Sequence, residues 1–415
     1  MQLSELARQL ARVALAAVDP ERLAREELER RGGRFDAALA IGKAAAGLAR
    51  GAGPAERRLL VQPHSSPPLL DPRWEQLRGG HPLPDRRSLA AGERVAAWLA
   101  GIEPSQRLLA LISGGASACL ERPAPGLTLE DLVSTQKALL ASGLPIQSVN
   151  AVRKHLSLLK GGGALRATRG RVLALLLSDV PGDDPATLAS GPFAADPTTY
   201  TQALEAVAGL PLPEPVRRHL AAGANGEVPE TVKPGDPDLE RVETVLLAGG
   251  RTAARAILAE ARRHGLTAVA GNLAGEAAAA GRVLVARGRD LGERVAVVLA
   301  GETTVTLDRT GHGGRNGELA LAAARELATR PPGGVEAVLA LATDGEDGPT
   351  RYAGAVVDNR SWEAVRRAGV DPAAALERHD SYTALAAVPG AVLETGPTGT
   401  NVADLAVYLR LPASL

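Results

Sequence analysis

Short apolar runs alternate with longer amphipathic segments along most of the chain. The runs predict strands, and the segments with apolar residues at helical spacing predict helices. The strands expected in the first half are Ala37–Ile41, Arg58–Gln62, Leu108–Ile112 and Val172–Leu177, and the helices are Lys43–Arg50, Ser88–Ala100, Thr128–Ala141 and Ser148–Leu159. Because these strands are apolar throughout, we expect an α/β fold whose mainly parallel sheet has helices on both faces.

The alternation stops over residues 222–241, which are rich in glycine, proline and charge. We predict a domain boundary there, between residues 1–235 and 240–415. Beyond it the expected strands are Thr244–Ala248, Val295–Ala300 and Ala337–Ala342, and the helices are Thr252–His264, Glu276–Arg287 and Asn316–Thr329. The second half is therefore predicted to be another α/β domain.

The N-terminal segment predicts an amphipathic helix, with Leu3, Leu6 and Leu10 on one face and charged residues on the other. Charges interrupt any signal-peptide core, and no window reaches the ~18 apolar residues of a spanning helix. We therefore expect a cytoplasmic protein that does not enter a membrane.

Charge and composition exclude several classes of function. The chain has 47 basic and 47 acidic residues, and a neutral chain lacks the basic excess that nucleic-acid binding needs. Its one cysteine, Cys119, excludes a disulfide framework, and we expect a buried apolar role for it. The seven histidines are scattered, so His81 and His155 are expected on a loop and a helix face.

Lys43 follows the first predicted strand, and it is one of only five lysines among the 47 basic residues. A compact ammonium and a planar guanidinium are not interchangeable beside a phosphoryl oxygen. A surface lysine would be the ordinary interpretation, but position and scarcity together favour a functional one. The lysine follows the first glycine of its loop, so this is no P-loop.

Three further strand ends carry glycine-rich or acidic loops. The first of these loops predicts a backbone cradle for a phosphate or carboxylate, with a plain turn as the alternative. Its residues are Ser113, Gly114, Gly115 and Ser117. Asp179 and Asp183 are candidates to hold Mg²⁺ or to accept a hydroxyl proton, whereas Asp184 before a proline fits a turn. At the start of a C-terminal helix, Arg315 is expected to bind phosphate or carboxylate.

Seven sequence runs resemble the ATP-dependent glycerate 2-kinase family, whose C-terminal part is the MOFRL domain. They span about nine-tenths of the chain in the family's order: IGKAAAGLA, ISGGASACL, SDVPGDDPATLASGPFAADPTT, AGETTVTL, GGRNGELAL, TDGEDGPT and TGPTGTNVADL. The chain departs from the family pattern at Ala116, where glycine is usual, and at Gly317, where glutamine is usual.

The resemblance implies an N-terminal Rossmann-like domain, a smaller C-terminal α/β domain and an active site in the cleft between them. It implies phosphorylation of D-glycerate by ATP with Mg²⁺, giving 2-phosphoglycerate by direct in-line transfer. Lys43 and Arg315 would neutralise the transferred group, and Asp179 would act as base or metal ligand. Weaker candidates for substrate, nucleotide or metal contacts are Asn316, Gly313, Gly314, Asp344, Thr398 and Asp183.

Two alternatives share features with this hypothesis. A hydroxypyruvate reductase would act on the same carbon skeleton, and members of the family carry that name, but no G-x-G-x-x-G follows a predicted strand. A non-catalytic sugar-acid binding protein would need neither Lys43 nor clustered aspartates. Small-molecule substrates are the only expected partners, and a homodimer is left open.

Overall fold

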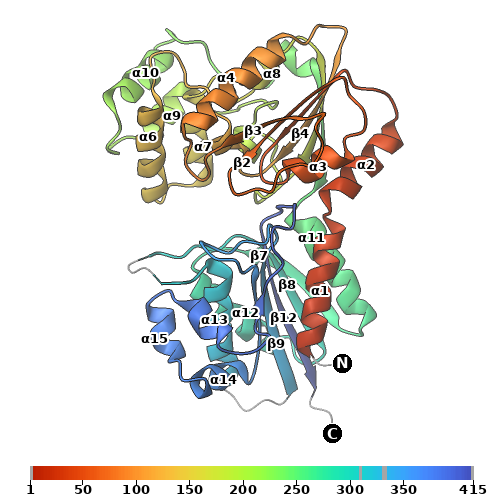
Figure 1. Ribbon diagram of the computed structural model, residues 1–415. Coiled ribbons are helices and arrows are strands. Elements are labelled where there is room, and N and C mark those ends of the chain that lie inside the picture. The colour runs from red at the N-terminus through yellow and green to blue at the C-terminus, as the bar shows by residue number, and fades with distance from the viewer. Residues whose placement is uncertain (1–2, 308–310, 330–333, 413–415) are drawn as a thin grey trace. The chain divides into compact units, whose positions relative to one another are not determined.

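The computed structural model describes residues 3–307, 311–329 and 334–412, and the chain forms two compact units (Figure 1). The first unit is Pro20–Leu247, and the second joins residues up to Asp19 with those from Ala248 onward. These bounds differ from the predicted domains 1–235 and 240–415 at both ends. The N-terminal helix belongs to the C-terminal unit, and the strand predicted to open the second domain belongs to the first.

The first unit contains a six-stranded sheet in the order β3-β2-β1-β4-β5-β6. The pairs from β3 to β5 are all parallel, as the uniformly apolar strands predicted. The strands are β1 (Ala37–Ile41), β2 (Arg57–Pro63), β3 (Glu75–Gly79), β4 (Arg107–Ser113), β5 (Arg171–Leu177) and β6 (Val242–Ala248). This is the strand order of doubly wound nucleotide-binding folds.

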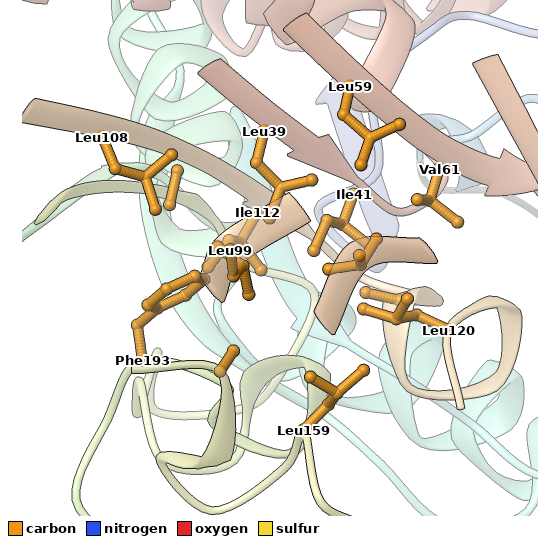
Figure 2. Close-up of a cluster of buried hydrophobic side chains, with 14 of the residues drawn as sticks. Leu39, Ile41, Leu59, Val61, Leu99, Leu108, Ile112, Leu120, Leu159 and Phe193 are labelled. Carbon is orange, nitrogen blue, oxygen red and sulfur yellow. The ribbon is translucent and has the colours of Figure 1, made fainter. Parts of the chain in front are cut away.

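Helices cover both faces of this sheet. They are α2 (Pro20–Arg31), α3 (Ala45–Gly51), α4 (Arg86–Ala100), α5 (Ala116–Cys119), α6 (Leu129–Ala141), α7 (Ile146–His155), α8 (Gly163–Arg166), α9 (Tyr200–Ala206) and α10 (Glu214–Ala224). Leu39 and Leu59 pack with Leu99 of α4 in the core drawn in Figure 2. Their neighbours Ala38 and Ala40 face the opposite way and are also fully buried, on the side where α3 contacts the sheet.

Helices α6, α7, α9 and α10 form a separate helical layer with its own core, which contains Leu139, Val152 and Leu220. Figure 1 shows these four helices beside one another, away from α2 and α3. Sequence analysis predicted α6 and α7 but neither α9 nor α10.

The second unit contains another six-stranded sheet, in the order β11-β10-β9-β12-β8-β7. Among the described strand pairs of this sheet, β7 and β8 are parallel and the others are antiparallel, so the sheet of this second α/β unit is mixed. The strands are β7 (Thr267–Leu273), β8 (Val295–Gly301), β9 (Gly334–Ala342), β10 (Gly354–Asp358), β11 (Val392–Leu393) and β12 (Asp404–Pro412). Because β12 runs antiparallel between β8 and β9, its first residue lies where those two strands end.

Helices also cover both faces of the second sheet. They are α1 (Leu3–Ala17), α11 (Gly250–Arg263), α12 (Ala277–Asp290), α13 (Arg315–Ala328), α14 (Ser361–Arg367), α15 (Pro372–Glu377) and α16 (Ser381–Ala386). Figure 1 shows α1 and α11 on one face and α12 and α13 on the other. None of the helices in the described part of the chain has the length and apolar character needed to cross a membrane.

Candidate active site

The loops that follow β1 and β4 meet at the point where the strand order of the first sheet reverses. Strands β1 and β4 are neighbours, with Ile41 paired to Ile112. The Lys43 backbone N–H donates to the Gly114 carbonyl over 2.9 Å, and the Ala44 N–H donates to Ser113 Oγ over 3.0 Å. Such a reversal at the carboxyl edge of a parallel sheet is where doubly wound folds bind ligands.

Two side chains lie against Gly115, which precedes α5 and has φ of +80°. A β-carbon placed on Gly115 would lie 3.0 Å from Lys43 Cγ and 3.3 Å from His81 Cδ2. The stem of Lys43 therefore packs against the glycine turn, and its catalytic role stays a prediction. Sequence analysis assigned His81 to an ordinary loop, and its place beside Lys43 was not foreseen.

The carboxylate of Asp179 lies directly over Gly114. Any β-carbon at Gly114 would overlap both oxygens of Asp179, so only glycine leaves room for the carboxylate. The structure thus brings together Lys43, Asp179 and the Gly114–Gly115 backbone, which come from three strand ends separated by more than 60 residues of chain.

Ser113 was expected to bind an anion through its backbone, which stays a prediction, and the structure gives its side chain a further role. Its hydroxyl accepts the Ala44 N–H and donates to the Ile41 carbonyl over 3.3 Å, and the residue is fully buried. Both hydrogen bonds fix the β1 and β4 loops to each other. Ser113 therefore holds the cradle together through its side chain, while Ser117 lines a neighbouring pocket.

The other acidic residues of the β5 loop are placed differently. Asp184 accepts the Ala186 N–H and the Thr187 hydroxyl, which confirms its expected turn role. Asp183 has φ of +57°, a turn conformation. Among the described residues no group of three or more His, Cys, Asp or Glu side chains gathers as a metal site would require. Two carboxylates still fit Mg²⁺, which usually takes few protein ligands together with substrate phosphates.

A pocket of about 180 Å³, which we call the α6–α7 pocket, opens beside Gly115 and Ser117. Residues of α6 and α7 line this pocket, and so does His81. The ion pair between Lys160 and Glu121 borders it, and both of these side chains are buried. The scarcity of lysine could have pointed to α7 and the segment after it. Lys160 lines the pocket, and Lys154 on α7 is buried and paired with Asp196 at 3.1 Å.

Cys119, at the end of α5, has the buried role that its composition predicted. The residue is fully buried, and burial raises the pKa of its thiol to about 12. A thiol with that pKa is almost fully protonated at neutral pH and is a poor nucleophile.

In the second unit, Arg315 opens α13 at the edge where β8 and β9 end. Its guanidinium forms a two-pronged ion pair with Asp404, the first residue of β12, and contacts Glu302 at 2.5 Å. Burial lowers the pKa of Arg315 and the ion pair with Asp404 raises it, with a net rise. Arg315 is therefore a firmly charged group with a fixed orientation.

The N-terminus of α13 is occupied by a carboxylate of the protein itself. Asp347 accepts the backbone N–H groups of Asn316 at 3.1 Å and Gly317 at 2.8 Å. It also accepts from the Asn316 amide at 3.3 Å and from the Tyr382 hydroxyl at 2.7 Å. Asn316 therefore has a structural contact with Asp347, and its predicted contact with substrate phosphate stays a prediction.

The glycines around this helix start serve close packing. A β-carbon on Gly314 would overlap Asp347, and one on Gly313 would overlap the His379 carbonyl. One on Gly317 would lie 2.8 Å from the Tyr382 ring, which explains why this chain lacks the larger side chain usual at that position. The predicted nucleotide contacts of Gly313 and Gly314 stay predictions.

Asp344 and Thr398 come together after β9. The Thr398 N–H donates to the Asp344 carbonyl over 3.2 Å, and its hydroxyl donates to the Thr343 carbonyl over 2.5 Å. Their proximity agrees with a common contact surface, although Thr398 also has a clear role in holding the two loops together.

Two family models match the chain. The model described as a domain of unknown function, DUF4147, matches residues 6–221, and the MOFRL family matches residues 295–404. Both regions include the loops described above.

Similar proteins have been found among curated sequences and solved structures. The glycerate 2-kinase of Pyrococcus horikoshii is 39% identical over 81% of this chain and 78% of its own length. A protein of Agrobacterium vitis with the provisional name hydroxypyruvate reductase is 42% identical over 81% of this chain and 77% of its own. The crystal structure of glycerate kinase from Thermotoga maritima has a TM-score of 0.85, with 34% identity and 99% coverage of both chains.

Proposed function

Because the chain belongs to the glycerate kinase family with a DUF4147 domain and a MOFRL domain, we propose that it transfers the γ-phosphoryl group of ATP to the 2-hydroxyl of D-glycerate. The observation that carries the proposal is the meeting of Lys43, Asp179 and the Gly114–Gly115 backbone at the reversal of the first sheet. A cation, a carboxylate and an exposed peptide edge are the groups that phosphoryl transfer requires.

In the proposed step, the 2-hydroxyl oxygen forms a bond to the γ-phosphorus while the bond to the β–γ bridging oxygen breaks. The hydroxyl proton goes to the Asp179 carboxylate, and ADP leaves with the bridging oxygen. Lys43 lies beside Gly115, so its ammonium would compensate the charge on the transferred group.

Arg315 is proposed as the second cation. Its guanidinium is oriented by buried Asp404, while its other carboxylate contact, Glu302, is half exposed. A phosphate that replaced Glu302 would meet an arginine already held in place. Orientation by Asp404 would then lower the entropic cost of binding.

Asp183 would hold Mg²⁺, which would supply positive charge at the phosphates of ATP, and Asp179 is the alternative ligand in a step where it does not act as the base. The cytoplasmic location and the homodimer stay predictions.

The product tests the proposal. Purified protein with D-glycerate, ATP and Mg²⁺ should release ADP and form 2-phosphoglycerate, which enolase converts without added phosphoglycerate mutase. A signal that requires the mutase would mean phosphorylation at the 3-hydroxyl. Oxidation of NADH with hydroxypyruvate, and no ADP from glycerate, would instead establish the reductase that the name of the Agrobacterium relative suggests.

Replacing Gly114 by alanine should lower kcat by about 10²-fold and leave the protein folded. The added methyl group overlaps the Asp179 carboxylate and must displace it, and a displacement of about 1 Å can cost that much in rate. The measurements are kcat and the melting temperature.

Gly126→Ala is the matched control. Gly126 differs from Gly114 in having a positive φ, and nothing lies within 4 Å of a β-carbon placed there. It should lose a little stability from its backbone conformation and no activity. Equal kcat in the two alanine variants would contradict the role of Asp179.

A further inference from the structure

Arg153 is a guanidinium that lines the α6–α7 pocket and lacks an acidic partner among the described residues. It stands in the last turn of α7, and its neighbours Lys154 and His155 are both paired with carboxylates. The contacts of Arg153 itself are to amide oxygens, Gln136 Oε1 at 2.8 Å and Asn150 Oδ1 at 3.5 Å. Burial lowers the pKa of this half-buried guanidinium and the charge of Glu121 raises it, with a net fall, so the charge of Arg153 is only partly compensated.

Such an arrangement is costly unless a ligand supplies the opposite charge. A buried cation is normally paired, because desolvation is not otherwise recovered. The nearest acid in the pocket, Glu121, is already paired with Lys160. The charged groups that line the pocket therefore leave a net positive charge at Arg153.

Thr135 supplies a second and independent observation. It lines the same pocket from α6, it is 2% exposed, and its hydroxyl has no hydrogen-bond partner in the structure. Buried hydroxyls are nearly always hydrogen-bonded. A cation without an acidic partner among the described residues and a hydroxyl without a hydrogen bond, both lining one pocket, describe a site for a small anionic group with accepting oxygens.

We propose that the α6–α7 pocket binds the carboxylate of the hydroxy acid that is phosphorylated, and that Arg153 and Thr135 recognise it. The inference rests on the proposed function. The pocket also reaches Gly115, against which Lys43 lies. An acid anchored at Arg153 would therefore extend toward the phosphoryl-transfer groups, and its volume of about 180 Å³ suits a three-carbon acid.

The test is the affinity of D-glycerate, measured by calorimetry without ATP, alongside the affinity of ADP. Arg153→Gln should weaken glycerate binding by about 10- to 100-fold, the range for a hydrogen bond to a charged group. It should leave ADP affinity unchanged and abolish the preference for glycerate over glycerol. The glycerate affinity of Arg153→Lys should lie between those of wild type and Arg153→Gln, because lysine keeps the charge but loses the paired N–H donors of the guanidinium.

Thr135→Val separates recognition from a structural role. Removing a hydroxyl that has no partner should not lower the melting temperature, yet glycerate affinity should fall several-fold. This variant, together with Arg153→Lys, keeps the test decisive if Arg153→Gln does not fold. Arg94→Gln is the matched control, since Arg94 is an exposed helix arginine paired with Glu75.

Two outcomes would overturn the proposal. One is unchanged glycerate affinity in folded Arg153 and Thr135 variants, and the other is a selective loss of ADP affinity, which would make this a nucleotide pocket. A failure of the proposed function alone would give a different result: wild-type protein would bind glycerate in an Arg153-dependent way but would form no phosphorylated product.

Discussion

Replacing Lys43 by methionine should lower kcat by about 10²- to 10³-fold while ATP affinity changes by less than tenfold. That is the loss seen when one preorganised group is removed from a developing negative charge. The expected loss in kcat exceeds the loss in ATP affinity because charge on the transferred oxygens is greatest in the transition state. The ammonium therefore contributes more there than in the bound ground state. Steady-state kinetics with varied ATP and glycerate would measure both quantities.

Lys43→Arg should also be impaired, although it keeps the charge. The Lys43 stem packs against Gly115, and the broader planar guanidinium would misplace the charge. Lys137→Met is the matched control, because Lys137 is an exposed lysine on α6 and should tolerate the change. Near wild-type kcat in folded Lys43→Met would contradict the catalytic role and leave Arg315 as the leading cation.

Asp347→Ala should be the most destabilising single substitution considered for the second unit, at about 3 to 5 kcal/mol. The carboxylate is 1% exposed and accepts from two backbone N–H groups, the Asn316 amide and the Tyr382 hydroxyl. Its removal would leave these buried donors without partners at the start of α13. Urea unfolding at neutral pH would measure the change in the free energy of unfolding.

Asp371→Ala is the control for this prediction. Asp371 also caps a helix, accepting from Ala373 at 2.9 Å and Ala374 at 3.3 Å, but it is exposed to solvent. Water can replace it there, so the loss should be about 1 kcal/mol. Equal losses in the two variants would show that Asp347 acts only as a surface cap. Arg315 directly precedes Asn316 and Gly317, whose N–H groups Asp347 accepts, so the Asp347 variant should also lose activity.

Several features followed from the sequence because they depend on local pattern. The apolar runs of β1, β4 and β5 were predicted almost to the residue, since strands buried on both faces show no alternation. Lys43 became a candidate from the sequence because the chain uses lysine so rarely. Strand β3 was missed for the corresponding reason: its residues, Glu75–Gly79, are mostly polar and only partly buried.

Other features depended on which strands became neighbours, and no local pattern encodes that. The placement of β6 in the first sheet, and of β12 between β8 and β9, results from hydrogen bonding between segments far apart in the chain. The antiparallel direction of β12 brings Asp404 to Arg315, and folding of the β9 loop brings Asp347 to α13. Sequence analysis therefore predicted an anion site at Asn316 where a carboxylate of the protein already binds.

The sequence by itself determined the two α/β sheets, the family and the residue types of the Lys43, Gly114 and Asp179 loops. Only the tertiary structure decided that these loops meet and that Ser113 holds them together. It also decided that Arg153, which has no acidic partner among the described residues, shares a pocket with the unbonded Thr135 hydroxyl. The physical reason is that strand and helix signals come from neighbouring residues. Pairing and burial of a charged or polar group depend instead on every segment that packs around it.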